Sequence, residues 1–257
     1  MKHFLIILLM MLTLNTIAQE NLAYQQPSPE IMELVDVQLA PYVLLDDENK
    51  NMVLLYRDAY KTIEELSQEE LRLGGLRIDP STNIGSRVTY YNNLKVKSLT
   101  KKKAVITEVD GLPDNPRLAN FRWSPDQTKI AFTNTTSQGV SCWYLDIASA
   151  KAKVLTVENI NANLGDVINW FEDSETVLVK LISKDRDELI NTKIAIPTGP
   201  TISRGDGKKA QNRTYQDLLK NKNDEHNFMQ LSLSELYQVN LKGEAKLWLA
   251  SSMYDDI

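Results

Sequence analysis

The feature that most constrains the fold of this chain is a hairpin motif that occurs twice, 47 residues apart. In the first copy, residues 121–134 read FRWSPDQTKIAFTN, an extended segment followed by a tight turn and an apolar return segment. Proline presets φ at the second turn position, and aspartate accepts hydrogen bonds from the amides that follow it, so this composition favours a turn. The second copy is VINWFEDSETVLVKL at 167–181. The motif residues are Trp123, Ser124, Pro125 and Asp126 in the first copy and Trp170 and Asp173 in the second.

The spacing of the two copies indicates the fold class. Propeller blades repeat at roughly 40 to 50 residues, and such repeats bury their faces only against one another. A degenerate earlier copy lies in the hairpin 45–56, where Leu45 stands at the tryptophan position and Glu48 at the aspartate position. We predict an all-β fold, a partial β-propeller of TolB/WSPD type with short helical insertions. With a final partial unit at 232–249, these copies fall short of the four or so blades that a closed ring needs.

The tryptophans allow two interpretations. A large aromatic residue at a fixed repeat position packs between neighbouring sheets, whereas an exposed one can stack on a ligand. We predict packing for Trp123 and Trp170, and the same for Trp143 and Trp248.

Three stretches predict short helices outside the strands. Residues 29–37, 62–71 and 214–229 have helical spacing and good helix formers. Ser28 and Thr214 are the N-cap candidates for the first and the third. The second is expected to end at the glycine pair that follows it.

The N-terminus has the pattern of a cleaved secretory signal peptide. Lys2 and His3 precede an apolar run at 4–12, and small residues reach Ala18. This run is short for a membrane span. We predict a secreted or periplasmic protein with no membrane attachment after cleavage. The predicted domains are a signal peptide at 1–18, an N-terminal lead at 19–41 and an incomplete propeller at 42–257, truncated at its C-terminal end.

The charge of the chain argues against a nucleic-acid partner. The formal net charge is −5, whereas phosphate binding needs an excess of lysine and arginine. The basic run at 101–103 is assigned to a solvated turn.

Residues for metal or covalent chemistry are scarce. Cys142 is the only cysteine, and His226 is the only histidine after residue 18. We therefore expect no metal, no cofactor and no intramolecular disulfide. The acidic run 46–48 matches no calcium loop and is interpreted as a solvated hairpin tip. No G-x-S-x-G motif occurs, and His226 is expected on a surface helix, so we predict no catalytic residues.

Three short motifs are interpreted conservatively. The sequence Arg-Gly-Asp at 204–206 is attributed to coincidence in a glycine-rich loop. Asn134 and Asn212 begin glycosylation sequons, which matter only in a eukaryotic secretory host.

Several further segments carry a family resemblance. They are SPEIMELVD (28–36), ELRLGGLRIDPSTN (70–83), GLPDNPRLAN (111–120), IPTGP (196–200) and GKKAQNRTYQDLLKN (207–221). Together with the WSPD turn, they resemble the N-terminal propeller region of secreted serine peptidases of the prolyl oligopeptidase family, most closely the glutamyl endopeptidase-like branch. In that family an α/β-hydrolase domain with the Ser-Asp-His triad follows the propeller, and no such domain occurs in these residues.

The resemblance implies a function that the chain does not perform by itself. It would be the non-catalytic propeller segment of an exported serine peptidase and would sterically gate peptide substrates in the full-length parent. Its partner would be the hydrolase domain in cis. The alternative is a free-standing periplasmic protein-interaction module of propeller type. Substrate preference is not expected to be readable from this part of the protein.

Overall fold

The computed structural model describes residues 25–100, 103–192, 194, 196, 199, 207–208 and 215–257. The chain divides into two compact units, Met1–Val37 and Gln38–Ile257. In the first unit, helix α2 (Pro29–Val35) begins after Ser28 with a proline in its first turn, as predicted. In the part of the chain that the structure describes, no helix is long and apolar enough to cross a membrane.

Several predicted features fall outside the described residues. They are the signal peptide at 1–18, two lysines of the run at 101–103, the Arg-Gly-Asp sequence at 204–206, the sequon at Asn212 and the N-cap at Thr214. All of them stay predictions.

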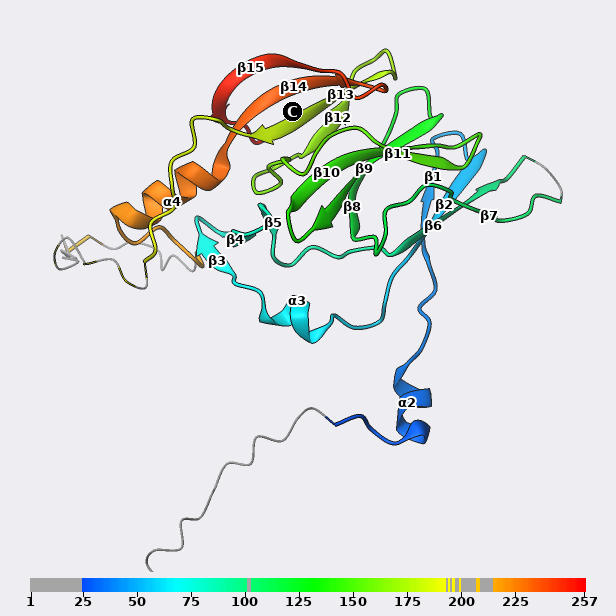
Figure 1. Ribbon diagram of the computed structural model, residues 1–257, viewed down its shortest axis with the longest axis horizontal. Coiled ribbons are helices and arrows are strands. Elements are labelled where there is room, and N and C mark those ends of the chain that lie inside the picture. Colours follow the sequence, from blue (N-terminus) through cyan, green and yellow to red (C-terminus); the bar gives the residue numbers. More distant parts are fainter. Residues whose placement is uncertain are drawn as a thin grey trace, which may run out of the picture. The chain divides into compact units, whose positions relative to one another are not determined.

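The second unit is mostly β structure, built from antiparallel sheets (Figure 1). Three of the described sheets are four-stranded, and in each the strands follow chain order from one edge to the other. Sheet A contains β1 (Tyr42–Leu45), β2 (Asn51–Tyr56), β6 (Asn93–Ser98) and β7 (Thr107–Glu108). Sheet C contains β8 (Leu118–Trp123), β9 (Lys129–Thr136), β10 (Gly139–Asp146) and β11 (Lys151–Val154). Sheet D contains β12 (Ile168–Trp170), β13 (Thr176–Ile182), β14 (Leu233–Asn240) and β15 (Ala245–Met253). The β class is confirmed, and the propeller stays a prediction.

Sheet C lies between sheets A and D and is buried on both faces. Successive side chains of a strand point to opposite faces. On β9, Ile130 and Phe132 share one core with Val53 of sheet A. Ala131, between them, shares another core with Val177 of sheet D. This is why the strand reads as an uninterrupted apolar run and not as an alternating one.

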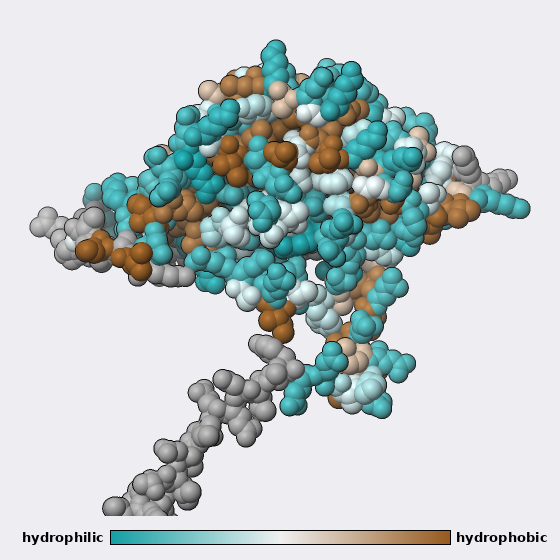
Figure 2. Space-filling model, viewed as in Figure 1, coloured by the Kyte–Doolittle hydropathy of each residue, from teal (hydrophilic) through white to brown (hydrophobic). Residues whose placement is uncertain are grey.

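Sheets A and D expose apolar side chains on their outer strands. On β1, Leu44 packs into the core shared with sheet C, whereas Val43 and Leu45 on the opposite face are exposed. On the edge strand β15, Leu247 and Leu249 are exposed. Figure 2 shows hydrophobic surface close to the point where Figure 1 marks the C-terminus. The stack therefore has apolar surface on both outer sheets.

Two insertions interrupt the sheets at one end. The insertion between β2 and β6 carries α3 (Ile63–Ser67) and sheet B, formed by β3 (Leu71–Leu73), β4 (Leu76–Asp79) and β5 (Ile84–Gly85). The insertion between β13 and β14 carries α4 (Lys222–Ser232).

The two insertions pack against each other around a small core of their own. Ile78 of sheet B and Leu231 of α4 are both buried in it. At Gly74, where φ is +58°, an added Cβ would lie 2.8 Å from the ring of Phe228 on α4. Glycine is therefore required at position 74 by both backbone conformation and close approach.

The structure shows that the predicted unit at 232–249 is not a separate repeat. Strand β14 pairs with β13 along its length, and β15 pairs with β14. These strands complete sheet D, which begins with the second motif copy. The long insertion at 183–232 hid this continuity, because it separates the second and third strands of one sheet.

Two predicted helices are shorter than expected. The capping box of Thr62 and Glu65 starts α3, but the helix ends at Ser67, and the glycine pair forms the β3–β4 turn instead. The helix expected from residue 214 begins only at Lys222, because the Asn221 side chain accepts a hydrogen bond from the amide of Asp224 and fixes the start there.

Candidate functional site

The first two strands of sheets A, C and D are joined by turns of the same geometry. In each turn one residue adopts a left-handed backbone conformation: Asn49 (φ 54°), Gln127 (φ 59°) and Ser174 (φ 55°). In each, one backbone N–H donates to the carbonyl five positions later: Asp46 to Asn51 (3.2 Å), Ser124 to Lys129 (2.8 Å) and Phe171 to Thr176 (3.0 Å). The degenerate copy predicted at Leu45 is thus a third turn of the same kind.

Side-chain oxygens accept hydrogen bonds from the amides that close these turns. In sheet C, Asp126 accepts from the amide of Thr128 at 3.0 Å, and Ser124 Oγ accepts from the amide of Lys129 at 2.9 Å. In sheet D, Asp173 alone accepts from both equivalent amides, each at 2.9 Å. The turns are therefore stabilised by the motif residues themselves.

The turn of sheet A uses a different carboxylate from the one predicted. Glu48 occupies the aspartate position, but Asp46 accepts from the amides of Lys50 at 2.7 Å and Asn51 at 2.9 Å. Asp46 is buried, so the interpretation of this run as a solvated tip is wrong for that residue. The cause is that a carboxylate two positions earlier reaches the same two amides.

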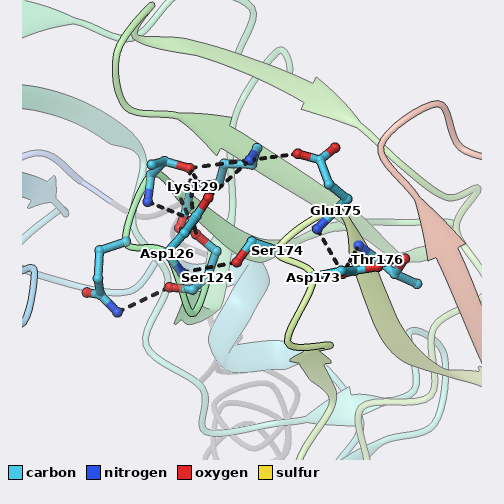
Figure 3. A network of polar contacts seen from close by, with 9 residues as sticks. Ser124, Asp126, Lys129, Asp173, Ser174, Glu175 and Thr176 are labelled. Atoms are coloured by element: carbon cyan, nitrogen blue, oxygen red, sulfur yellow. Dashed lines mark hydrogen bonds and ion pairs between the residues drawn. The ribbon is translucent and has the colours of Figure 1, made fainter.

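The three turns are also hydrogen-bonded to one another in series. The amide of Asp47 donates to Gln127 Oε1 at 3.1 Å, and the amide of Asp126 donates to Ser174 Oγ at 3.0 Å. Lys129 adds an ion pair with Glu175 at 3.1 Å. Figure 3 shows the part of this network that joins the turns of sheets C and D. In both links, the acceptor belongs to the residue with positive φ in the next turn.

The motif tryptophans lie where consecutive sheets meet. Trp170 is 8% exposed, belongs to the core between sheets C and D, and donates through Nε1 to the carbonyl of Arg122 at 3.0 Å. Trp123 is half-buried against the core between sheets A and C. Leu45, the equivalent residue of sheet A, is 45% exposed.

The other two tryptophans behave differently from each other. Trp143 is half-buried against the A–C core and donates to Ser141 Oγ at 2.9 Å. Trp248 is 47% exposed and makes an edge contact with the ring of Phe171, 5.6 Å between centroids. The prediction of core packing is wrong for Trp248, because it lies on the edge strand β15.

The carboxylates at the turns of sheets C and D stabilise the backbone of those turns. Burial by itself raises the pKa of Asp126, but hydrogen bonds from Ser124 and Thr128 outweigh it and lower the pKa. Asp173 follows the same pattern, with burial opposed by bonds from Glu175 and Thr176. Hydrogen bonds to the ionised form explain both directions. The carboxylates are therefore ionised acceptors that fix the backbone, and this end of the sheets has a structural role.

The opposite end of the sheets holds a cavity of about 620 Å³. It lies between the segment 57–68 with α3, the segment 89–92 that leads into β6, and the turn 115–117 that leads into β8. Its walls contain the tyrosine rings of Tyr60, Tyr90 and Tyr91 and side chains of both charges. A volume of this size suits a small-molecule or short-peptide ligand.

Arg117 is the most distinctive side chain of this cavity. Its guanidinium carbon lies 4.3 Å from the centroid of the Tyr90 ring. Its backbone is fixed on sheet C, with the amide donating to Asn134 Oδ1 at 3.0 Å and the carbonyl accepting from Thr135 at 3.0 Å. Its buried Nε has no hydrogen-bond partner among the described residues. Arg117 is thus a positioned donor group with unused capacity.

Sequence reasoning did not find this cavity. Arg117 stands inside GLPDNPRLAN, but a single arginine after a turn has no spacing that marks a site. The cavity is formed by segments that are distant in sequence and meet only when sheets A and C pack.

None of the remaining candidate residues lines this cavity. His226 lies on α4, with Nε2 3.0 Å from the carbonyl oxygen of Glu188. Burial raises the pKa of Cys142 to about 12, so its thiol is unreactive. Asn134 is buried and bonded to Arg117, so the folded chain does not present this sequon. Among the described residues, no group of three or more metal-ligating His, Cys, Asp and Glu side chains occurs.

Comparison with curated proteins shows sequence similarity to probable glutamyl endopeptidases. No family model matches the chain. The chain is 30% identical over 233 residues to a probable chloroplastic glutamyl endopeptidase of Arabidopsis thaliana, which covers 87% of this chain and 24% of that protein. It is 28% identical over 237 residues to a protein of the same description from Oryza sativa subsp. japonica, covering 88% of this chain and 25% of that protein. The chain is thus homologous to glutamyl endopeptidase-like proteins and spans about a quarter of their length.

Solved structures give weaker matches. An acylaminoacyl peptidase in complex with Z-Gly-Gly-Phe-chloromethyl ketone matches with a TM-score of 0.37 and 15% identity, covering 81% of this chain and 25% of that one. A putative TolB from Agrobacterium tumefaciens matches with a TM-score of 0.31 and 13% identity, covering 85% of this chain and 64% of that one.

Proposed function

We propose that this chain is the non-catalytic propeller segment of an exported serine peptidase, and that it gates access of peptide substrates sterically in a longer parent protein. The observation that carries the proposal is the stack of three four-stranded meanders in which sheet C is covered on both faces. Consecutive propeller blades bury their faces in this way. The similarity to probable glutamyl endopeptidases supports the peptidase assignment.

The proposal includes a partner and a location. The partner is an α/β-hydrolase domain in cis, which would carry the nucleophile, and the substrates are peptides short enough to pass the propeller. Export rests on the N-terminal sequence pattern alone. Sequencing the reading frame past codon 257 tests the cis arrangement. A hydrolase domain with G-x-S-x-G supports it, and a stop codon at that point contradicts it.

Catalysis by the chain itself is tested directly. A serine-directed fluorophosphonate and a panel of acidic and proline-containing peptides are applied to the purified chain. We expect neither labelling nor cleavage, because no G-x-S-x-G motif is present to supply a nucleophile. Labelling of a single serine together with cleavage would overturn the non-catalytic assignment.

Gating is tested in the parent protein. A short peptide and the same sequence placed in a loop of a folded protein are compared as substrates. We expect cleavage of the short peptide only, because the gate acts by size. Equal rates for both substrates would contradict a steric role.

A second candidate is a free-standing periplasmic protein-interaction module. The observation in its favour is that the described residues form three hydrophobic cores with fully buried side chains, such as Val177, Phe132 and Ile78. Light scattering after size exclusion and a thermal melt decide between the two. A cooperative melt and a single defined species favour the module, whereas aggregation favours a segment that needs its parent.

A further inference from the structure

The two interfaces between the stacked sheets repeat the same positions of the fold. Positions on the second strand of each sheet are counted from the residue whose carbonyl accepts the turn-closing bond. The first residue after it faces the preceding sheet, as Ile130 does toward sheet A and Val177 toward sheet C. The second residue after it faces the next sheet, as Val53 does toward sheet C and Ala131 toward sheet D. Each of these sheets thus has one face for a preceding sheet and one for a following sheet.

Two of these faces have no partner sheet among the described residues. They are the face of sheet A for a preceding sheet and the face of sheet D for a following sheet. On sheet A, Leu45 and Leu54 lie on the free face, since the residues beside them pack toward sheet C. On sheet D, Leu178 lies between two core residues of β13, and Leu249 pairs with Leu236. Leu45 is 45% exposed and Leu249 is 43% exposed, so both faces present apolar surface.

The series of hydrogen bonds between the turns is open at the same face of sheet A. Gln127 and Ser174, the residues with positive φ in the turns of sheets C and D, each accept from an amide of the preceding turn. Asn49 is the equivalent residue of sheet A, with φ of 54°. Its side chain accepts no hydrogen bond from any residue that the structure describes. Sheet A therefore has the acceptor that the other two sheets use toward a preceding sheet.

The free face of sheet D also repeats a feature of the two formed interfaces. At each of those, the segment that follows the outer strand packs into the core: Leu112 follows β7 and Leu155 follows β11. The segment after β15 lies across the free face of sheet D in the same way. The carbonyl of Tyr254 accepts from Lys180 Nζ at 3.2 Å, and that of Asp255 accepts from the amide of Asp166 at 2.8 Å. The free faces therefore continue the pattern of the interfaces already present.

The number of sheets selects what covers these faces. Closed rings of four-stranded sheets contain about four to eight sheets. The described residues form three. One copy supplies too few and three copies too many, whereas two copies together fall within the range. A two-fold arrangement of two copies also leaves no unmatched face, because each copy offers both kinds.

We propose that a second copy of this chain covers both free faces, with sheet D of each copy packed on sheet A of the other, so that two copies close one ring. The inference goes beyond the proposed function, because it concerns this chain by itself. In a longer parent, further sheets in cis would occupy the same two faces. A hydrolase domain found past codon 257 leaves the outcome for this chain unchanged, so the two proposals fail separately.

Sedimentation velocity of the purified chain, from nanomolar to micromolar concentration, tests the ring. We expect one species of twice the chain mass that dissociates to a monomer on dilution. A monomer at all concentrations would overturn the proposal. A mass that keeps rising with concentration would also overturn it, because the same faces would then form open chains.

Two substitutions distinguish the ring from other dimers. Leu45→Asp and Leu249→Asp each place a carboxylate on one free face, and each is expected to raise the dissociation constant about 100-fold or more. A dimer through sheet A alone responds only to the first, and a dimer through sheet D alone only to the second, so loss in one variant only contradicts the ring. The matched control is Leu66→Asp on α3, where the leucine is 70% exposed, and it is expected to leave the dissociation constant unchanged.

A milder measurement decides the matter if an aspartate variant does not fold. The only native cysteine, Cys142, is buried, so a maleimide reports on an introduced cysteine. In Leu45→Cys and Leu249→Cys, labelling is expected to be about tenfold or more slower in the dimer than in the diluted monomer. Leu66→Cys is expected to react at the same rate in both. Labelling at positions 45 and 249 that does not depend on protein concentration would contradict the covered faces.

Discussion

The two ends of the stacked sheets differ in how their polar groups are used. At the turn end, the residues of the WSPD-type motif bond to amides of their own turn and of the next. At the opposite end, the insertion between β2 and β6 and the turn 115–117 line a cavity, and the buried Nε of Arg117 beside it has no hydrogen-bond partner among the described residues. Closed networks stabilise a backbone, whereas positioned but unused donors are available to a ligand. The polar groups of the turn end are therefore paired within the fold, whereas part of the donor capacity at the cavity end is not.

The largest expected effect is on the free energy of unfolding, and it differs among the three residues at the tryptophan position of the motif. Trp170→Ala is expected to lower the free energy of unfolding by about 3–5 kcal/mol, because it opens a cavity between two packed sheets. Trp123→Ala is expected to cost less, since the residue is half-buried. Leu45→Ala is expected to change the stability of the single chain by less than about 0.5 kcal/mol, because no sheet of the same chain covers it. Urea denaturation followed by circular dichroism, at a concentration where the chain is monomeric, measures the free energy of unfolding of each variant. Equal losses of stability in all three variants would contradict the proposed dependence on burial.

The next prediction concerns the pH dependence of stability, which we attribute to a buried lysine on β13. Lys180 is 1% exposed, and its Nζ donates to the carbonyls of Leu164 and Tyr254. Burial lowers its pKa from 10.5 to about 8, against the opposing effects of Asp255, Asp166 and Asp256.

Because the unfolded chain binds more protons between those two pKa values, the free energy of unfolding is expected to rise with pH from about 8 to 10.5. The slope is at most about 1.4 kcal/mol per pH unit. Lys180→Met is the control and is expected to lose this part of the slope. An identical pH profile in both proteins would show that Lys180 is not the cause.

At the turn end, Asp173→Asn is expected to lower stability by about 1 kcal/mol, because a neutral amide oxygen is a weaker acceptor for the two turn amides. The folded pKa of Asp173 is lowered, so its contribution is present above the ordinary aspartate pKa and is lost as pH falls through the folded value. Denaturation at neutral and acid pH measures both effects. A difference in stability between the unmodified chain and Asp173→Asn that stays constant into strong acid would contradict the role of the charge.

The links between turns give a smaller effect. Ser174→Ala removes the acceptor for the amide of Asp126, and a loss of about 0.5–1 kcal/mol is expected. Gln127→Ala removes the exposed link to Asp47, and a loss within about 0.5 kcal/mol is expected. Hydrogen exchange of the amides of Asp126 and Asp47 follows each link separately. Faster exchange at Asp47 than at Asp126 in the unmodified chain is also expected, and the reverse order would contradict this ranking.

A small effect on stability is also expected at the cavity end. Arg117→Gln removes a cation–π contact and a long ion pair, which together contribute less than about 1 kcal/mol. Thermal denaturation checks this. A loss as large as that of Trp170→Ala would show that Arg117 is structural, and the division between the two ends would fail.

The sequence by itself determined the turns, the strands on either side of them and the β class. Turn residues such as Pro125 and Asp126 act locally, through fixed φ and hydrogen bonds to nearby amides, so their pattern is readable without a fold. The same is true of the N-cap at Ser28 and of the apolar run at 130–132.

The tertiary structure alone decided which strands share a sheet and where the cavity lies. Strands β13 and β14 are separated by about 50 residues and pair through backbone bonds that leave no sequence pattern. Arg117 gains its role only because sheets A and C pack and bring Tyr90 and Glu65 beside it. Local hydrogen bonding is written in neighbouring residues, whereas contacts between distant segments depend on the packing of the whole unit.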